Sequence, residues 1–542
     1  MRRLFLALCA ATAALALGSA PALARPADQP PTEFGTDWHD PVTAAPPVER
    51  PATPSCEVTV AQTEFRDYTP YRGQYAPPAR CGDRWSKVVL RLDGAVAGRQ
   101  YDRLGYLRIG GVEVLRTSTP EPSPQGITWT VEKDVTRYAA ALRTAQPVEM
   151  LIGNTVNETY TGVIKVKATL TFYTASGAVP PARTPDKVLT LQGAQEGGPV
   201  YEGSVTTPRN SERIVAEVYA TGSGGGCEEF WYLAVPDAAP YSCKAKDGPH
   251  REVRIAVDGK PAGIAAPFPA VWTGGWSNPF LWYVIPGPRA FDVRPVEYDL
   301  TPFAGLLNDG RPHRITVSVA GVPEGQAGWS TPTNVLVWQD PGKQHVTGGL
   351  LAHREGTPAS RAAYEPRDGH TVRAEGGHAL TVSGYTDTSH GRVVTTVSRN
   401  VTASSTHHWT DGETTDGLKA RWNDDETVTT LPGHGPASVT TAHRVYTMDG
   451  ETSVDTAGRL RTVMAMGDRA DGVSLRAGER TGWYRTDDRY TGDAAYTMNV
   501  PREQRHAVGV SRERYRVQGP GLCYDRTLAT AQGELTEDRR GC

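Results

Sequence analysis

Two adjacent carboxylates, Glu228 and Glu229, follow a run of glycines and precede two large aromatic residues. Hydrolysis of an amide or glycosidic bond needs one group that activates water and another that stabilises or protonates the leaving atom. Carboxylates whose pKa values are pushed apart can divide those tasks. Residues 213–219 alternate as a half-buried strand does, so we expect the glutamates on a loop at a strand end. The alternative is a surface loop, pinned by Cys227, whose acids are merely solvated.

A third acid, Asp102, occupies a comparable place earlier in the chain. It follows the strand pattern of residues 88–92 as Glu229 follows that of residues 213–219. The neighbouring Arg103 favours the ionised form of Asp102. If equivalent loops of two packed domains meet, these carboxylates will lie at a domain interface, where ligand clefts are common.

Four tryptophans lie near the second acidic loop in the sequence. Aromatic faces suit the C–H faces of sugars, whereas ordinary core packing is the alternative and is favoured for at least one or two of the four. The group comprises Trp231, Trp272, Trp276 and Trp282, of which Trp231 and Trp282 are taken as candidate sugar contacts.

The chain carries two copies of one pattern. Segment 134–142 resembles segment 299–307, and each precedes a strand pattern. The Gly110-Gly111 turn has a counterpart at Asp258-Gly259. Chance similarity is the alternative, but a repeat at this spacing is typical of duplicated units. Glycine and proline are abundant, at 57 and 42 residues, and helical periodicity is scarce, which favours an all-β protein. We predict two tandem jelly-roll-like antiparallel β-sandwiches packed side by side, followed by a C-terminal β-rich domain.

The N-terminus has the pattern of a secretory signal. A basic start precedes an apolar core, and Ala22-Leu-Ala24 fits a cleavage site. A stretch rich in proline and alanine follows, as expected of an exposed linker or extended arm. The predicted divisions are a signal peptide at 1–24, the arm at 25–54, the first sandwich at 55–178, the second at 186–345 and the C-terminal domain at 346–542.

Cysteine usage agrees with export, because disulfides form in oxidising compartments. Without the cysteine of the signal, six remain, which allow 15 pairings. Their local clustering favours Cys56–Cys81, Cys227–Cys243 and Cys523–Cys542. A zinc site is the alternative, although the spacings do not resemble C-x-x-C knuckles.

Several function classes are disfavoured. The net charge of −3 does not suggest nucleic acid or an anionic membrane as a partner. After the signal, no stretch approaches the ~18 apolar residues of a membrane span. The sequence has no G-x-S-x-G elbow, H-E-x-x-H motif or Walker loop. We expect a secreted monomer without membrane association once the signal is removed.

Several runs of residues are specific enough to indicate a family. They are GRQYDRL at 98–104, GGVEVLRTSTPEP at 110–122, GCEEFWY at 226–232, YDLTPF at 298–303 and GYTDTSHG at 384–391. With them the chain resembles the peptide N-glycanase A family, the peptide-N4-(N-acetyl-β-glucosaminyl)asparagine amidases. The resemblance spans most of the mature chain and is strong in the two predicted sandwiches.

This resemblance implies a hydrolase of the amide C–N bond between an N-glycan and asparagine. The asparagine of the glycopeptide or glycoprotein becomes aspartate, and the glycan leaves as a glycosylamine that later loses ammonia. No metal or cofactor is implied. The related peptide N-glycanase F has two β-sandwiches with acids at their interface. Its aromatic-Asp-Arg and Cys-x-Glu runs resemble residues 101–103 and 227–229, which carries its principal acid onto Asp102 and an interface glutamate onto Glu229. Glu158 is the candidate for its third acid.

The resulting hypothesis gives each residue a role. Asp102 orients and activates water or polarises the linkage, and Arg103 sets its charge. Glu229, helped by Glu228, binds the first N-acetylglucosamine and the peptide side of the bond. Two alternatives remain open: a carbohydrate-binding protein without catalysis, and a glycosidase that uses the same carboxylates on a C–O bond.

Overall fold

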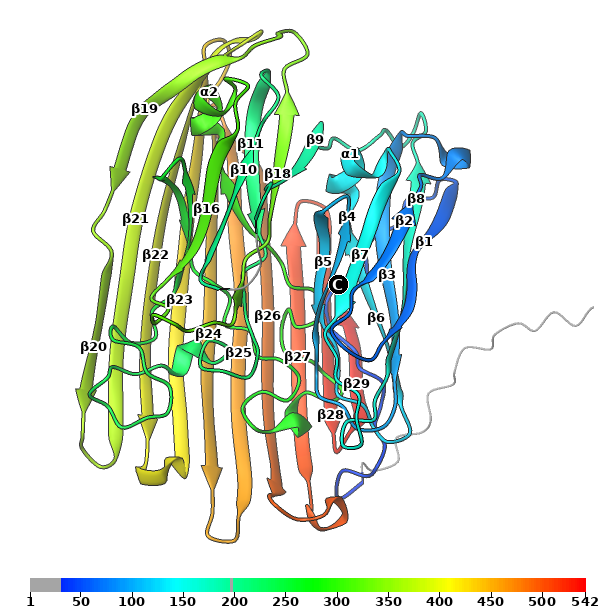
Figure 1. Cartoon of the computed structure of the whole chain (residues 1–542), viewed down its shortest axis with the longest axis vertical. Coiled ribbons are helices and arrows are strands. Elements are labelled where there is room, and N and C mark those ends of the chain that lie inside the picture. Colours follow the sequence, from blue (N-terminus) through cyan, green and yellow to red (C-terminus); the bar gives the residue numbers. More distant parts are fainter. Residues whose placement is uncertain (1–30, 195–197) are drawn as a thin grey trace, which may run out of the picture.

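The computed structural model describes residues 31–194 and 198–542, and this part of the chain is almost entirely β (Figure 1). The predicted signal peptide lies outside the described residues. The first sandwich has two four-stranded antiparallel sheets. Strands such as β6 (Ile127–Asp134) and β8 (Ile164–Thr174) alternate buried and less buried side chains, because one face of each sheet covers the core. One sheet has the order β1 (Ser55–Phe65), β8 (Ile164–Thr174), β3 (Trp85–Val96), β6 (Ile127–Asp134), and the other β2 (Tyr71–Tyr75), β7 (Gln146–Ile152), β4 (Leu104–Ile109), β5 (Val112–Ser118).

The second sandwich repeats this arrangement. Its sheets have the orders β9 (Lys187–Thr190), β18 (Thr333–Gln339), β11 (Ser211–Val218), β15 (Val296–Asp299), and β10 (Val200–Val205), β16 (His313–Ala320), β13 (Glu252–Val257), β14 (Lys260–Ala265). Two short strands, β12 (Thr221–Gly222) and β17 (Trp329–Ser330), are additions. Strand for strand, both sandwiches have the order of a jelly roll, so the predicted fold class is confirmed.

Small features of the repeat also correspond. The β4–β5 turn at Gly110-Gly111 and the β13–β14 turn at Asp258-Gly259 have positive φ at both residues, as two-residue hairpin turns require. Helices α1 (Ala139–Leu142) and α2 (Ala304–Leu307) occupy equivalent places before β7 and β16. By this correspondence, the β3–β4 connection of the first sandwich is equivalent to the β11–β13 connection of the second.

The sandwiches pack side by side through polar contacts that are mostly buried. Arg116 donates from Nη1 to Oγ1 of Thr221 at 2.9 Å. The Asn334 amide donates to the carbonyl of Glu113 at 2.9 Å, and the Ser118 amide donates to the carbonyl of Ala290 at the same distance. These hydrogen bonds join β5 of the first sandwich to β12, β18 and the β14–β15 connection of the second.

The C-terminal domain is one antiparallel sheet of eleven strands. Their bounds are β19 (Thr347–Glu355), β20 (Ala359–Glu365), β21 (His370–Thr388), β22 (Gly391–Trp409), β23 (Thr415–Pro432), β24 (Ser438–Val454), β25 (Arg459–Arg476), β26 (Glu479–Thr497), β27 (Val508–Gly519), β28 (Leu522–Ala531) and β29 (Glu534–Gly541). In Figure 1 the long strands run behind the second sandwich. Arg399 ties the two together, pairing with Asp424 and donating to the Glu297 carbonyl at 2.8 Å.

Residues 31–54 form an extended arm that packs against the rest of the molecule. Amides of Phe34, His39 and Val42 donate to distant carbonyls at 2.8–2.9 Å. Trp38 is 5% exposed and stacks on Tyr283 with ring centroids 4.1 Å apart. Trp38 and the three amides thus attach this segment to the second sandwich and the C-terminal sheet.

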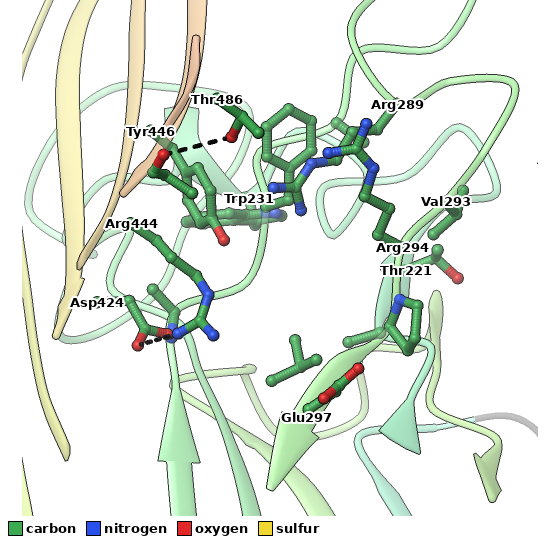
Figure 2. A pocket seen from close by; sticks show the side chains of 18 of the residues that line it. Thr221, Trp231, Arg289, Val293, Arg294, Glu297, Asp424, Arg444, Tyr446 and Thr486 are labelled. Carbon is green, nitrogen blue, oxygen red and sulfur yellow. Dashed lines mark hydrogen bonds and ion pairs between the residues drawn. The ribbon is translucent and has the colours of Figure 1, made fainter. Parts of the chain in front are cut away.

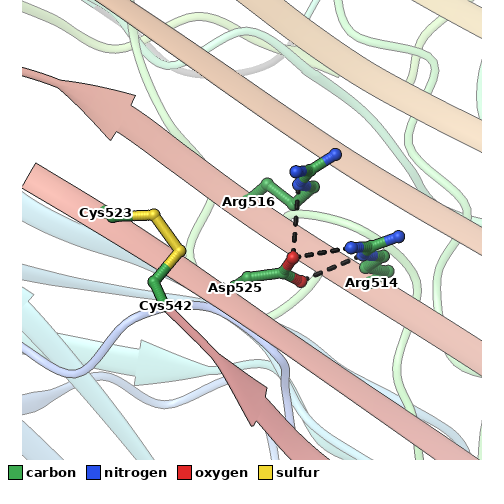
Figure 3. The surroundings of a disulfide bond; sticks show 5 residues. All are labelled: Arg514, Arg516, Cys523, Asp525 and Cys542. Carbon is green, nitrogen blue, oxygen red and sulfur yellow. Dashed lines mark hydrogen bonds and ion pairs between the residues drawn. A yellow bond between two sulfur atoms is a disulfide. The ribbon is translucent and has the colours of Figure 1, made fainter.

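Three disulfides tie the described chain, with the pairings that the clustering predicted: Cys56–Cys81, Cys227–Cys243 and Cys523–Cys542. The last joins β28 to the end of β29, next to the ion pairs of Asp525 with Arg514 and Arg516 (Figure 3). Within the described residues, no helix has the length and apolar character to cross a membrane.

Candidate active site

Asp102 lies partly buried in the β3–β4 connection. Gln100 organises this loop: its side-chain oxygen accepts from Nη2 of Arg103 at 2.6 Å, and its amide donates to the carbonyl of Thr155 at 3.0 Å. The Arg103 backbone amide donates to Oγ1 of Thr119 at 2.9 Å. The loop that carries Asp102 is thus fixed against the connection that follows β5.

Glu229 lies in the equivalent connection of the second sandwich, between β12 and β13. Its Oε2 accepts from the Gly225 amide at 2.6 Å. Gly222 is needed because a Cβ there would lie 2.2 Å from the Glu228 carbonyl oxygen. The same glycine accepts from Nε1 of Trp272 at 3.1 Å. A close backbone approach, not flexibility, therefore explains this glycine of the Gly-rich run.

Glu228 points away from its neighbour. It is 1% exposed. Arg251 donates to it from Nε to Oε2 at 2.9 Å and from Nη2 to Oε1 at 2.7 Å. Trp329 donates from Nε1 to the same Oε2 at 2.6 Å. With its oxygens occupied, Glu228 has the surroundings of a buried structural ion pair, and the structure does not bring it to Asp102.

A carboxylate that the sequence analysis did not select, Glu121, meets Asp102 instead. It lies in the connection between β5 and β6 and is 7% exposed. A Cβ built on Gly274 would lie 2.7 Å from Oε1 of Glu121 and 3.3 Å from Oδ1 of Asp102. Gly274 comes from the equivalent β14–β15 connection and has a φ of +117°. Both carboxylates therefore converge on a backbone position that only glycine suits.

Glu158, the predicted third acid, lies elsewhere. It is exposed between β7 and β8 and belongs to neither of the two cavities that Asp102 lines. Glu121 was hard to select because it stands between two prolines in a segment without periodicity. The sequence feature that could have indicated Glu121 is the internal repeat, which makes the β5–β6 and β14–β15 connections equivalent.

Two cavities share Tyr101, Asp102 and Glu229, and together we call them the acidic cleft. The smaller cavity, of about 520 Å³, is also lined by Tyr68, Arg103, Gly224, Gly225 and Trp272. The larger cavity, of about 940 Å³, is also lined by Glu121, Tyr160, Gly274, Tyr283 and residues of the C-terminal domain. Asp102 and Glu229 line both cavities, whereas Glu121 lines only the larger one.

The surroundings of the three acids raise their pKa values. Burial raises the pKa of Glu229, but the amides of Gly225 and Gly224 oppose this. Burial raises the pKa of Asp102 well above its usual range, and the Glu229 charge raises it further. Burial, followed by the Asp102 charge, likewise raises the pKa of Glu121. Burial and the Glu229 charge outweigh the charge of Arg103, so Arg103 does not hold the pKa of Asp102 down as the sequence predicted.

The predicted sugar contacts Trp231 and Trp282 are buried. Trp282 is 0% exposed, donates from Nε1 to the Gly275 carbonyl at 3.1 Å and stacks on Tyr490 of the C-terminal sheet. Trp231 is 2% exposed and packs against Trp422. Partners from the C-terminal domain, far away in sequence, place both rings in the core.

Tyrosines supply the accessible rings of the cleft. Tyr101 is 48% exposed, and its ring lies 5.3 Å from that of Tyr160. Tyr68, 64% exposed, lines the smaller cavity. Their accessible faces can pack on the C–H faces of a sugar or on a peptide.

A third cavity, of about 420 Å³, is shown in Figure 2. Trp231, Glu229 and five arginines line it. The arginines mostly serve ion pairs between domains, as in Arg289 with Asp468 and Arg137 with Glu297. Away from all three cavities, Glu212, Asp340 and His390 have the mutual spacing of metal ligands, but Asp340 already accepts from Ser389 and Gly342.

Comparisons with known proteins agree on one family. The sequence pattern of the family described as peptide N-acetyl-beta-D-glucosaminyl asparaginase amidase A matches residues 41–355. The chain is 31% identical over 358 residues to peptide-N4-(N-acetyl-beta-glucosaminyl)asparagine amidase A of Prunus dulcis, a match that covers 60% of each protein. The chain therefore spans about 60% of the length of this relative.

Two solved structures of PNGF-II, in space groups P21 and C2, show weak likeness. Their TM-scores are 0.35 and 0.37, with 15% and 13% identity. The matches cover 53% of this chain, and 66% and 65% of those chains. Scores this low do not establish a shared fold.

Proposed function

The chain belongs to the peptide N-acetyl-β-D-glucosaminyl asparaginase amidase A family, and on that premise we propose that it hydrolyses the amide bond between an N-glycan and an asparagine side chain. The substrate is an N-linked glycopeptide or glycoprotein. The peptide asparagine becomes aspartate, and the glycan leaves as a glycosylamine that loses ammonia in water. The convergence of Asp102, Glu121 and Glu229 from both sandwiches on one cleft carries this proposal.

The convergence of Asp102 and Glu121 on Gly274 suggests how the acids divide the reaction. Ionised Asp102 takes a proton from water as the water oxygen bonds to the amide carbon. Protonated Glu121 hydrogen-bonds to the developing oxyanion and then gives its proton to the leaving nitrogen as the C–N bond breaks. The products are a peptide carboxyl group and a glycosylamine.

Glu229 acts by binding and by charge. We assign it the first N-acetylglucosamine, whose hydroxyl and amide groups can donate to an ionised carboxylate. Its charge also raises the pKa of Asp102, whereas the charge of Arg103 lowers that pKa. Glu228 is a positioning residue, because its ion pair with Arg251 fixes the backbone just before Glu229.

The test is mass spectrometry of a defined N-glycopeptide after incubation with the protein in the presence of EDTA. We expect intact glycan release and conversion of asparagine to aspartate. A product that keeps N-acetylglucosamine on asparagine would mean a glycosidase instead. Binding without cleavage would mean a carbohydrate-binding protein.

Asp102→Asn should abolish turnover, with a loss of at least about a thousandfold in kcat, because the amide cannot accept the proton of water. The exposed Glu158→Gln is the matched control and should retain full activity. Activity like that of the wild type in Asp102→Asn would refute the role of Asp102.

We also propose that the protein is exported and works as a monomer. The three disulfides of the described chain support export, since such bonds persist in oxidising compartments. Sedimentation at several concentrations would test the monomer, and detection in culture medium would test export.

A further inference from the structure

The N-terminal arm contacts the loop that carries Glu121. Ser123, two residues after Glu121, donates from Oγ to Oδ1 of Asp37 at 2.8 Å. Because Ser123 is buried, water cannot readily replace this partner. In the same loop, Gln125 donates from Nε2 to Oγ1 of Thr36 at 3.2 Å. These hydrogen bonds anchor the β5–β6 connection to the arm within two residues of an acid of the cleft.

Trp38 of the arm packs on a second neighbour of Glu121, the side chain of Tyr283. The two rings are stacked, with centroids 4.1 Å apart and planes within 3° of parallel. Phe34, also in the arm, meets the ring of Tyr283 edge-on at 6.1 Å. Burial, followed by the Asp102 charge, raises the pKa of Glu121, and a hydrogen bond from Tyr283 opposes this rise. The arm therefore fixes a donor that faces Glu121.

Arg502 of the C-terminal domain is held by the same part of the arm. It donates from Nη2 to the Gly35 carbonyl at 3.3 Å, and its guanidinium lies 5.0 Å from the centroid of the Trp38 ring. Arg502 lines the larger cavity, and its charge also lowers the pKa of Glu121. Trp38 thus contacts both Tyr283 and Arg502, and each of these groups acts on Glu121.

Building on the proposed amidase function, we propose that the arm completes the active site, with Trp38 as a positioning residue that holds Tyr283 and Arg502 against Glu121. Trp38 precedes residues 41–355, over which the family pattern matches, and Arg502 follows them. This support for the acid is therefore built from parts of the chain that lie outside that pattern.

The direction of the effect follows from the groups that face Glu121. They are Tyr101, Asp102 and Arg103 of the β3–β4 connection, Tyr283 of the β14–β15 connection, and Tyr496 and Arg502 of the C-terminal domain. The arm holds Tyr283 and Arg502, and both favour the ionised form of Glu121. Without the Trp38 ring they should move away, and the pKa of Glu121 should rise. Since protonated Glu121 supplies the proton for the leaving nitrogen, the alkaline limb of the profile of kcat/KM against pH should move to higher pH.

The test compares Trp38→Leu, which keeps apolar volume, with Trp38→Phe, which keeps a ring that can stack. Trp38→Leu should lower kcat at least about tenfold and move the alkaline limb up by about half a pH unit or more. Trp38→Phe should restore most of both. A merely structural role would lower kcat without moving the limb. Asp40→Ala is the matched control, since its hydrogen bonds, to Thr128 of β6, attach the arm at another point, and it should keep the limb of the wild type.

An infrared titration separates this inference from the amidase function, because it needs no turnover. The band of the protonated Glu121 carboxyl is identified by its loss in Glu121→Gln, and its dependence on pH gives the pKa. In Trp38→Leu the midpoint should move to higher pH whether or not the protein cleaves amides. A folded Trp38→Leu that titrates like the wild type would overturn the inference, whereas a shifted midpoint without amide cleavage would refute only the amidase function.

If Trp38→Leu does not fold, Tyr283→Phe and Arg502→Gln take its place in the infrared titration. Each removes one of the groups through which Trp38 acts, and each should raise the midpoint of Glu121. Unchanged midpoints in both variants would refute the role of Trp38 equally, because the arm would then have no group through which to act.

Discussion

Glu228 and Glu229 show how neighbouring identical residues acquire different roles. Arg251 and Trp329 occupy the oxygens of the first, whereas a backbone amide and the open cleft surround the second. The sequence located the pair but not this division, because the deciding partners are 23 and 101 residues away from Glu228.

Glu228→Gln should lower the free energy of unfolding by about 3 kcal/mol, because it leaves the buried charge of Arg251 without its counterion. Urea denaturation measures this change, and Glu158→Gln, on an exposed turn, should shift stability by less than about 0.5 kcal/mol. If Glu228→Gln were as stable as the wild type yet inactive, Glu228 would have a chemical rather than a positioning role.

Glu229→Gln should move the acidic limb of the profile of kcat/KM against pH to lower pH. The Glu229 charge raises the pKa of Asp102, so its removal lets Asp102 ionise at lower pH. The maximum value of kcat/KM should fall as well, because Glu229 also binds substrate. Glu158→Gln controls for loss of a distant charge, and an unchanged limb in Glu229→Gln would contradict the electrostatic coupling.

Among the site residues, the two acids on equivalent loops were the most predictable. Asp102 and Glu229 follow stretches that were predicted to be strands, and the repeat indicated that their loops could meet. The second strand, β11, is buried on both faces over residues 214–218 rather than half-buried as predicted. Glu121 and the burial of Trp282 could not be predicted in the same way, because each depends on a partner brought by tertiary packing: Gly274 for the carboxylate and Tyr490 for the indole.

At the scale of elements, the cleft is built from matching connections of two jelly rolls. The β3–β4 and β11–β13 connections carry Asp102 and Glu229, and the β5–β6 and β14–β15 connections carry Glu121 and Gly274. The rigid sheets fix where each connection begins and ends, so the acids are placed by the sandwiches rather than by the loops alone.

The Cys227–Cys243 disulfide closes the connection that carries Glu229. Replacing both cysteines with alanine should reduce kcat/KM at least about tenfold, because the released loop samples positions in which Glu229 leaves the cleft. Cys523→Ala with Cys542→Ala is the matched control, since that bond lies at the end of the C-terminal sheet. Glycopeptide kinetics compare the two double variants, and equal losses in both would mean a general effect on stability.

At the scale of the whole molecule, the described domains share one hydrophobic core. A single cluster of buried side chains runs from Trp38 in the arm through both sandwiches to Leu528 in the C-terminal sheet. The buried ion pair Arg289–Asp468 joins the second sandwich to the C-terminal sheet. The buried pair Arg399–Asp424 lies within that sheet, where it faces the second sandwich. The domains therefore do not behave as independent modules.

Thermal unfolding of the full chain should consequently give one calorimetric transition, coincident with the loss of near-ultraviolet circular dichroism. A continuous core couples the domains, so that exposure of one interface destabilises the next. Two separable transitions, one of them leaving the sandwiches folded, would contradict this coupling.

Alternation and turn residues predicted strands in the two sandwiches and a β-rich character for the last part, but not the assembly of that part. Periodicity of two specifies a strand and its faces, whereas the number of strands in a sheet depends on long-range pairing. The sequence analysis therefore predicted a β-rich domain, and the structure shows a single sheet whose inner side needs the second sandwich to cover it.

An open sheet of this size leaves a free edge at β29, whose residues Glu537, Asp538, Arg539 and Arg540 are all charged. Pairs such as Arg512–Glu537 and Arg526–Asp538 hold several of these charges in place. A strand from another molecule could add to this edge only by desolvating them. We therefore expect this charged edge to oppose fibrous aggregation of the wide sheet.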